Sequence, residues 1–204
     1  MIISAIKQQV KRRDRYSIYV DGAYAFSLSE GGLIESRLAS GQEIDAARLS
    51  ELKQTAGLDK AYGNALRYVV MRPRSEWELQ DYFRRKQIDE SAALEIIERL
   101  RNLDLLNDLA FARAWVPNRR LLKQTSKRRL MLELKQKHVA EDTIRQVLEE
   151  DDTDERSQLK ALITKKRARY PDRQKLMQYL ARQGFRFDDI KSALEEVEAE
   201  EAEE

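Results

Sequence analysis

The first 30 residues alternate apolar and polar positions in the way that β-strands do. Two runs rich in β-branched and aromatic residues, 16–20 and 23–28, flank the pair Asp21-Gly22. Glycine accepts the positive φ of a type I′ turn, so an Asp-Gly pair between two such runs predicts a β-hairpin. Residues 2–10 are expected to add a third strand. The N-terminus is therefore predicted to form a small antiparallel β-sheet.

After residue 60 the apolar spacing becomes helical and repeats three times. Apolar residues at i, i+4 and i+9 recur without a gap at Leu79, Phe83 and Ile88, at Leu130, Leu134 and Val139, and at Leu176, Leu180 and Phe185. A second apolar set follows each window at the same offsets, as Ala93, Ile96 and Ile97, then Ile144, Val147 and Leu148, then Ile190, Ala193 and Leu194. Each window indicates two helices.

A further amphipathic helix precedes each window. Its apolar residues are Leu66, Val69 and Val70 in the first copy, Ala112, Trp115 and Val116 in the second, and Leu159, Leu162 and Ile163 in the third. The unit is thus three helices, with a period of about 46–51 residues, which is typical of tandem helical modules.

The starts of the middle helices carry capping residues. Ser75 and Glu78 form a capping box, in which the serine oxygen accepts from the third amide and the glutamate returns to the first. Ser126 and Asp172 occupy the same slot in the later copies and are good N-cap residues.

The ends of the same helices predict a left-handed residue. Gly184 stands where such a residue ends the third middle helix, and Gln87 and His138 stand at the matching positions. His138, the only histidine, is therefore interpreted as a helix terminus and not as a catalytic group. Pro117 falls inside the first helix of the second copy and is expected to bend or break it near Val116.

The predicted fold is mainly α, with three tandem three-helix repeats after a small N-terminal antiparallel sheet. Glycines at 31, 32 and 41 separate short helices expected over residues 33–39 and 45–56. The predicted domains are a sheet with short helices over residues 1–58, the three repeats over 59–107, 108–152 and 153–197, and a disordered acidic tail over 198–204.

Residues that catalysis or metal binding would need are scarce. The chain has no cysteine and a single histidine, which excludes disulfides and thiolate sites. It contains no phosphate-binding loop, dinucleotide fingerprint or HExxH motif. We expect no enzymatic activity, cofactor or metal. No apolar stretch approaches the roughly 20 residues of a membrane span, and no signal peptide is recognisable, so we expect a cytoplasmic protein.

Charge is distributed unevenly along the chain. The formal net charge is +2, but the last ten residues contribute −7, which leaves +9 for residues 1–194. A basic body with an acidic tail is common in proteins that meet nucleic acid or its protein coats. Solvated helix faces and a frayed tail are the alternative interpretation.

The basic residues concentrate at the junctions between helices. The candidate partner-binding or DNA-binding residues are Arg72, Arg74, Arg84, Arg85, Lys86, Arg119, Arg120, Lys123, Lys127, Arg128, Arg129, Lys165, Lys166, Arg167, Arg169 and Arg173. Cations at helix C-termini complement the helix dipole, which explains some of them without a partner. Lys127, Arg128 and Arg129 stand in a first turn, where the dipole disfavours cations, so a binding role is favoured there.

An ordered set of segments resembles the RecX family over residues 1–197. The most characteristic are residues 65–68 and 72–79, and the others are 97–100, 105–108, 111–116, Arg129-Leu130, Glu133-Leu134, 179–185 and the N-terminal 14–22. This sequence departs from the family pattern at four positions. Gln87 and His138 stand where the family usually has a glycine after the middle helix, and Gln124 replaces a residue that is often small. Pro117 interrupts a helix of the family pattern.

The resemblance implies a non-enzymatic protein that binds the RecA recombinase. In the family, an elongated, curved helical array lies in the groove of the RecA–DNA filament. It suppresses ATP hydrolysis, strand exchange and co-protease activity, and thereby modulates recombination, DNA repair and the SOS response. We expect a monomer that binds single- or double-stranded DNA only weakly. Direct DNA binding by the three-helix units, or a purely structural scaffold, are the alternatives.

Overall fold

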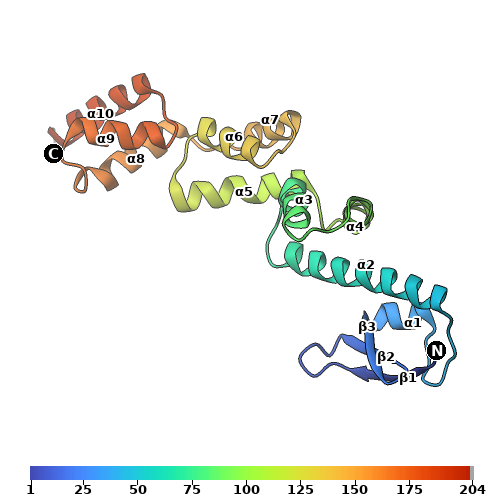
Figure 1. The fold of residues 1–204 in the computed structure, drawn as a ribbon. Helices are drawn as coiled ribbons and strands as arrows, with labels where there is room; N and C mark the ends of the chain where they lie inside the picture. Colours follow the sequence, from blue (N-terminus) through green and yellow to red (C-terminus); the bar gives the residue numbers. More distant parts are fainter. Residues whose placement is uncertain (203–204) are drawn as a thin grey trace. The chain divides into compact units, whose positions relative to one another are not determined.

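A computed structural model describes residues 1–202, which contain three strands and ten helices (Figure 1). The predicted mainly helical fold behind a small N-terminal sheet is confirmed. The chain forms two compact units: the first holds residues 1–72 and 79–105, and the second holds residues 73–78 and Leu106 onward. None of the described helices is long and apolar enough to cross a membrane.

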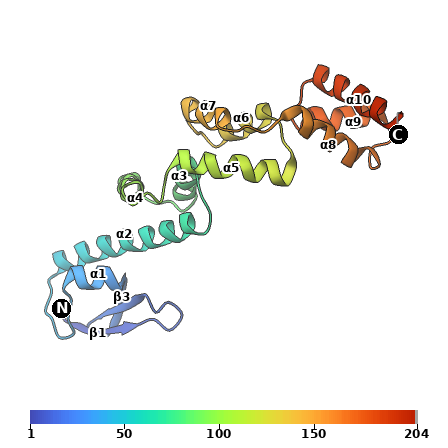
Figure 2. The ribbon, with the colours of Figure 1, turned by 180° about the vertical axis from the view of Figure 1, so that it is seen from behind.

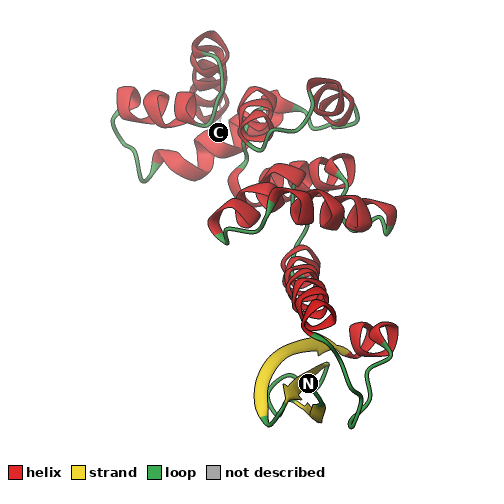
Figure 3. Ribbon diagram, turned by 45° about the vertical axis from the view of Figure 1, so that its right-hand side comes forward, coloured by secondary structure: helices red, strands yellow, loops and turns green. Residues whose placement is uncertain are grey.

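The N-terminal sheet has three antiparallel strands in the order β1-β2-β3, drawn in yellow in Figure 3. The strands are β1 (Ile3–Gln8), β2 (Arg15–Val20) and β3 (Ala23–Ser29). The hairpin between β2 and β3 turns on Asp21 at φ 47° and Gly22 at φ 83°. Two consecutive positive φ angles fit the predicted type I′ turn.

One face of this sheet packs on the start of a long helix, α2 (Ala46–Val70). The shared core consists of Ile3, Ile18, Val20, Phe26, Leu28, Ile44, Leu52 and Ala56. A buried ion pair joins sheet and helix, with Arg15 Nη1 lying 2.9 Å from Asp59 Oδ2. Asp59 also accepts from the amide and the hydroxyl of Ser29, the N-cap of α1 (Glu30–Ser36). The sheet is therefore anchored to α2 by both apolar and charged contacts.

The first repeat uses the second half of α2 as its first helix. Its other helices are α3 (Glu76–Arg85) and α4 (Glu90–Asn102). The bounds of the first two helices differ from those expected. The helix expected over 33–39 is α1 and begins earlier, at Glu30. The helix expected over 45–56 is α2, which continues through Gly57 and Gly63 without a break. The proposed boundary between residues 58 and 59 therefore lies inside a helix. Stacking of Tyr68 on Tyr82 and of Arg99 on Tyr62 packs the helices of this unit together.

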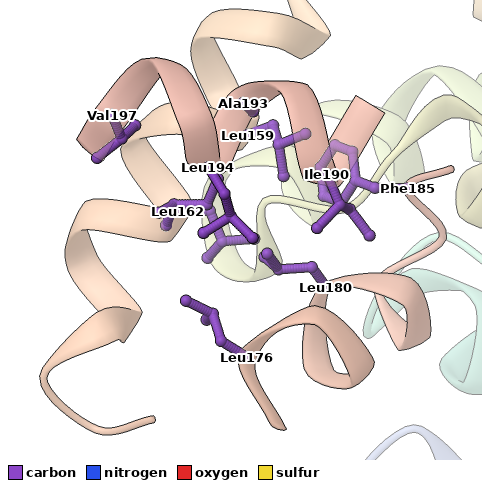
Figure 4. Packing of buried hydrophobic residues seen from close by; sticks show 10 residues of the cluster. Leu159, Leu162, Leu176, Leu180, Phe185, Ile190, Ala193, Leu194 and Val197 are labelled. Carbon is purple, nitrogen blue, oxygen red and sulfur yellow. The ribbon is translucent and has the colours of Figure 1, made fainter. Parts of the chain in front are cut away.

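The second unit contains the other two repeats (Figure 2). Its helices are α5 (Asp108–Lys123), α6 (Lys127–Gln136), α7 (Glu141–Glu149), α8 (Glu155–Arg167), α9 (Arg173–Arg182) and α10 (Phe187–Ala202). Each repeat has its own core made of the residues predicted from the period. In the third repeat, Leu162, Leu180 and Leu194 come from three different helices and point toward one another (Figure 4).

The left-handed ends of the middle helices are confirmed. Gln87, His138 and Gly184 have φ angles of 53°, 56° and 97°. After Gln87 and His138, the amide of the next residue donates to a carbonyl five residues earlier, from Ile88 to Phe83 and from Val139 to Leu134. This is the Schellman arrangement, which satisfies carbonyl groups that the helix itself leaves free.

Two expectations differ from the structure. The helix α5 continues through Pro117 and does not break at Val116. The proline ring faces solvent, while Ala112, Val116 and Arg120 are buried on either side of it, so packing holds the helix together. The tail was expected to be disordered over 198–204, but residues 198–202 continue α10. Residues 203 and 204 lie outside the described part.

Ion pairs explain why the described part of the acidic tail is helical. Glu198 pairs with Arg173 of α9 at 2.9 Å, and Glu200 pairs with Lys160 of α8 at 2.8 Å. One turn earlier, Glu196 pairs with both Lys160 and Arg156. Glu196 and Glu200 thus meet cations of α8, and Glu198 meets a cation of α9, all within the same repeat.

The start of each of the first two middle helices is capped twice. Ser75 Oγ accepts from the Glu78 amide at 3.3 Å, and Ser126 Oγ accepts from the Arg129 amide at 3.1 Å. The first amide of each helix donates to the first helical residue of the following repeat. Glu76 N donates to Asp108 Oδ1 at 2.8 Å, and Lys127 N donates to the Glu155 carboxylate. Successive repeats are therefore joined at a helix N-terminus, where a carboxylate also complements the dipole.

The junction of the second and third repeats has no room for a side chain at residue 184. The Gln183 carbonyl accepts from the Ser126 amide at 3.2 Å, which brings the turn after α9 against the start of α6. A Cβ on Gly184 would overlap Ser126 Oγ and lie 2.6 Å from the Cβ of Arg129. Glycine is required here by space as well as by its φ angle.

Arg120 is the central charged group of the same junction. Its guanidinium is only 7% exposed and lies 2.6 Å from Asp151 Oδ2 and 3.3 Å from Glu155 Oε1. It also donates to the Thr125 carbonyl at 2.5 Å and to Gln158 Oε1 at 2.8 Å. Burial acts to raise the pKa of Asp151, but hydrogen bonds from Thr153 and Arg120 outweigh it, and the pKa is lowered.

Gly184→Ala is expected to lower the free energy of unfolding by roughly 2–4 kcal/mol, the sum of the backbone strain and the overlap. The two tryptophans, Trp77 and Trp115, both lie in the second unit, so urea denaturation followed by tryptophan fluorescence reports on it. Gly57→Ala is the matched control. It adds a methyl to an exposed position of α2 with nothing within 4 Å, and should stabilise by about 1 kcal/mol, measured by far-UV circular dichroism. Equal effects of the two substitutions would contradict this account.

Arg120→Ala is expected to destabilise the second unit by about 3–5 kcal/mol, because it leaves Asp151 buried without its partner. Arg113→Ala on the same helix removes the exposed pair with Glu150 and should change stability little. Because the folded pKa of Asp151 is lowered, its contribution is present at neutral pH and is lost as pH falls below about 4. Tm measured from pH 7 to pH 3 should therefore fall more steeply in the wild type than in Arg120→Ala.

Candidate functional site

A basic cleft lies in the second unit between α6 and the end of α9. Two adjoining hollows of about 630 and 330 Å³ share Arg129 and Arg182 in their lining. Seven cations line them, here called the α6–α9 cleft: Lys123, Arg128, Arg129, Lys165, Lys166, Arg182 and Arg186. They come from the end of α5, the first turn of α6, the end of α8 and both sides of Gly184.

The local sequence explains why these cations converge. The Gln183–Ser126 hydrogen bond places the residues around Gly184 against the first turn of α6. Arg182 and Arg186 flank that glycine, and Arg128 follows the serine by two residues. The junction that joins the repeats therefore also brings basic residues together that are more than 50 positions apart in the sequence.

Little negative charge opposes them. The lining contains only two carboxylates, Glu133 and Asp188. Glu133 is already engaged, since it pairs with Arg119 at 2.9 Å and with Arg129 at 3.5 Å. It also accepts from Trp115 Nε1 at 3.1 Å. The other lining cations form no ion pair within residues 1–202, so the cleft presents unneutralised positive charge.

Aromatic and aliphatic side chains are exposed in the same cleft. Phe187 is 62% and Leu132 46% exposed at the rim of the larger hollow. Tyr179 lines the smaller hollow, stacks on Tyr170 and lies 5.8 Å from the Lys166 ammonium. Burial, and then the neighbouring Tyr170, raise the pKa of Tyr179, so its hydroxyl stays protonated at neutral pH. The surface combines cations with apolar groups.

The predicted basic residues are divided among different environments. Five of them line the α6–α9 cleft: Lys123, Arg128, Arg129, Lys165 and Lys166. The prediction that Arg120 binds a partner is wrong, because its side chain is buried in the junction and not available to a partner. Arg119 stacks on Trp115 and pairs with Glu133. Lys127 contributes its amide to the cap of α6.

The remaining predicted residues are not among those that line this cleft. Arg84 and Arg85 pair with Asp81 on α3, and Arg72 and Lys86 are exposed in the same first unit. Arg74 stands just before α3. In the third repeat, Arg173 pairs with Glu198, Arg167 lines another hollow with it, and Arg169 lies 5.9 Å from the Tyr170 ring.

Sequence reasoning missed Arg182 and Arg186 as site residues. Both could have been found from their position within two residues of Gly184, which was predicted to end a helix in the left-handed conformation. The three cations in the first turn of α6 are not equally available to a partner. Glu155 neutralises the start of α6 and Glu133 pairs with Arg129, so among the three cations of that turn Arg128 is the one left exposed and unpaired in the described chain.

Family models match the chain in four consecutive segments. They are described as the regulatory protein RecX N-terminal domain over residues 1–45, and as the first, second and third RecX three-helix domains over residues 61–100, 107–148 and 154–194. The three helical matches coincide with the three repeats.

Similar proteins and structures bear the same name. The regulatory protein RecX of Bacillus velezensis is 33% identical over 97% of this chain and 78% of its own length, and that of Bacillus subtilis is 30% identical over the same shares. A crystal structure of a regulatory protein RecX superimposes with a TM-score of 0.70 at 30% identity, covering 94% of this chain and 98% of that one. RecX from Lactobacillus salivarius gives a TM-score of 0.59 at 27% identity over 70% of this chain and 97% of that one. With four family models in register and relatives matching along nearly its whole length, the chain belongs to the RecX family of regulatory proteins.

Proposed function

We propose that this protein is a non-enzymatic regulator of the RecA recombinase that acts in the cytoplasm by binding the RecA–DNA filament in its helical groove. The observation that carries the proposal is the α6–α9 cleft, a concave surface with unpaired cations from two repeats. A filament groove is lined by protein and follows a polyanion, so it suits a surface that is both basic and apolar.

The apolar residues of the cleft favour a protein partner over bare DNA. Phe187 and Leu132 gain little from a sugar–phosphate backbone, whereas burying them against a protein surface contributes the hydrophobic part of an interface. Leu122 at the end of α5 is 70% exposed and adds to this apolar surface beside Lys123, since both residues line the smaller hollow. Direct, non-catalytic DNA binding by the cleft is the second candidate, since the same cations suit phosphates.

The proposed effect is inhibition. A monomer seated in the groove would bridge neighbouring RecA subunits and hinder the addition of further subunits. ATP hydrolysis, strand exchange and co-protease activity all depend on an extended filament, so all three are expected to fall together. Recombination, DNA repair and the SOS response would then be modulated through filament length.

Reversing three exposed cations of the cleft tests the proposal. Arg128→Glu, Arg182→Glu and Arg186→Glu together leave the caps and the core intact, because these side chains form no ion pair within residues 1–202. The wild-type protein is expected to inhibit the DNA-dependent ATPase of RecA at sub-stoichiometric ratios. The triple variant should need at least about tenfold more protein, since each lost charge contact at an interface costs about 1 kcal/mol or more.

The matched control reverses the same amount of charge elsewhere. Lys53→Glu, Lys175→Glu and Lys191→Glu are all exposed positions outside the cleft. This control should inhibit like the wild type, and circular dichroism should show both variants folded. Equal inhibition by the cleft variant and the wild type would remove the cleft from the mechanism. No inhibition by the wild type in several-fold excess would overturn the proposed function, and ATP hydrolysis by the protein alone would contradict the non-enzymatic part.

A further inference from the structure

One carboxylate lies among the cations of the smaller hollow of the α6–α9 cleft. This hollow is lined by Glu133 of α6 and, within the described chain, by five cations: Lys123, Arg129, Lys165, Lys166 and Arg182. The Glu133 side chain is only 11% exposed, so water screens its charge poorly. The other carboxylate of the cleft, Asp188, is exposed and lines the larger hollow. Glu133 is therefore the group that most strongly opposes an anion in the smaller hollow.

Three neighbouring groups hold the Glu133 carboxylate in place. Its Oε2 accepts from Trp115 Nε1 at 3.1 Å and lies 2.9 Å from Arg119 Nε. Its Oε1 lies 3.5 Å from Arg129 Nε. The Arg119 guanidinium in turn lies over the Trp115 ring, 4.3 Å from the centroid, so the two groups that hold Oε2 are packed on each other. The carboxylate cannot turn away from an incoming ligand without breaking these contacts.

Packing of the repeat does not by itself require a carboxylate at this position. The residue just before the second apolar position of the middle helix is Glu133 in the second repeat, Tyr82 in the first and Tyr179 in the third. Both tyrosines stack on another tyrosine ring, Tyr82 on Tyr68 and Tyr179 on Tyr170. The same place in the three-helix unit is thus filled twice by an uncharged aromatic side chain. The charge in the second repeat needs a different explanation.

A fixed carboxylate beneath a ring of cations discriminates between two kinds of ligand. The phosphodiester backbone of DNA presents negative charge and hydrogen-bond acceptors, so a phosphate that reached Arg129 would meet the Glu133 oxygens. Like charges brought together at an interface oppose binding, which is a common source of specificity. A protein segment presents acceptors and donors together, because every peptide unit other than that of proline has an N–H as well as a carbonyl. It can satisfy the cations and Glu133 at once.

We infer that Glu133 determines the specificity of the α6–α9 cleft, by opposing the DNA backbone and admitting a protein segment that brings a hydrogen-bond donor to the carboxylate. The inference rests on the proposed function, because it takes the protein-lined groove of the filament as the partner of the cleft. The unpaired cations alone suit either partner. Arg129 is the cation that Glu133 withholds from a phosphate.

Glu133→Gln tests the inference, because it removes the charge, keeps the size and still offers an oxygen to Trp115 Nε1. The full chain is titrated into a fluorescein-labelled oligo(dT) of about 15 nucleotides, and binding is followed by fluorescence anisotropy. The variant should gain one phosphate contact, through Arg129. The slope of log K against log salt should therefore become steeper by about 0.7, and Kd at about 50 mM salt should fall roughly five- to tenfold.

Glu141→Gln is the matched control. It makes the same change in net charge and frees Lys135, a cation that does not line the cleft. Glu141 is 79% exposed, so water already screens its charge. This variant should leave the Kd for the labelled strand within about twofold of the wild-type value, since its charge does not face the cleft. Circular dichroism establishes that both variants are folded.

Arg129→Gln, made in both backgrounds, tests whether the released cation causes the gain. With Glu133 present, the charge of Arg129 is neutralised, so its loss should change Kd less than about twofold. In the Glu133→Gln background the same substitution should remove most of the gain in affinity. The substitution keeps the Cβ that packs beside Gly184. Equal effects of Arg129→Gln in the two backgrounds would contradict the inference.

The DNA-dependent ATPase of RecA, with DNA in excess over the added protein, separates this inference from the proposed function. Glu133→Gln should need at least as much protein as the wild type for equal inhibition, because a tighter hold on DNA does not improve the contact with the groove. The inference is overturned if Glu133→Gln binds the oligonucleotide no more tightly, if Glu141→Gln gains as much, or if DNA binding and inhibition improve by the same factor. A wild type that does not inhibit RecA overturns the proposed function, and the oligonucleotide titrations still decide whether Glu133 opposes DNA.

Discussion

The second unit depends on how the N-terminus of α6 is satisfied. Four amides at the start of any helix have no partner within it. At α6 the Ser126 hydroxyl takes one of them and the Glu155 carboxylate of the following repeat takes another. Glu155 also meets Arg120, which reaches Asp151 and the Thr125 carbonyl. A local requirement of one helix thereby fixes where the next repeat begins.

The same junction decides the electrostatics of the surface. The carboxylates nearest to the start of α6 are directed inward, Glu155 to an amide and Asp151 to a buried guanidinium. On α10, Glu196, Glu198 and Glu200 pair with cations of α8 and α9. Six of the seven cations of the α6–α9 cleft, all except Arg129, remain without an ion pair in the described part of the chain. A chain with a net charge of only +2 in this way acquires a strongly basic cleft.

The period of the apolar residues was enough to predict the three repeats, their cores and the left-handed helix ends. Such features depend on spacing within about 25 residues, which a sequence displays directly. The cleft was predicted only in part, because Arg182 and Arg186 reach Arg128 through a contact between repeats. Arg120 was misassigned for the same reason, since its charge partners are about 30 residues away. Both α2 and α5 are continuous, so tertiary packing outweighs the low helix propensity of the glycines in α2 and of the proline in α5.

The residue at the left-handed helix end also decides what its neighbour can do. In the second repeat this residue is His138, whose ring stacks on Trp77 at the start of α3 with centroids 4.8 Å apart. The position of Trp77 is taken by Arg128 in the next copy, and the position of His138 by Gly184. Because glycine has no side chain, nothing stacks on Arg128, and the guanidinium stays open to the cleft. The glycine that permits the close approach of two repeats therefore also leaves Arg128 without a stacking partner in the described part of the chain.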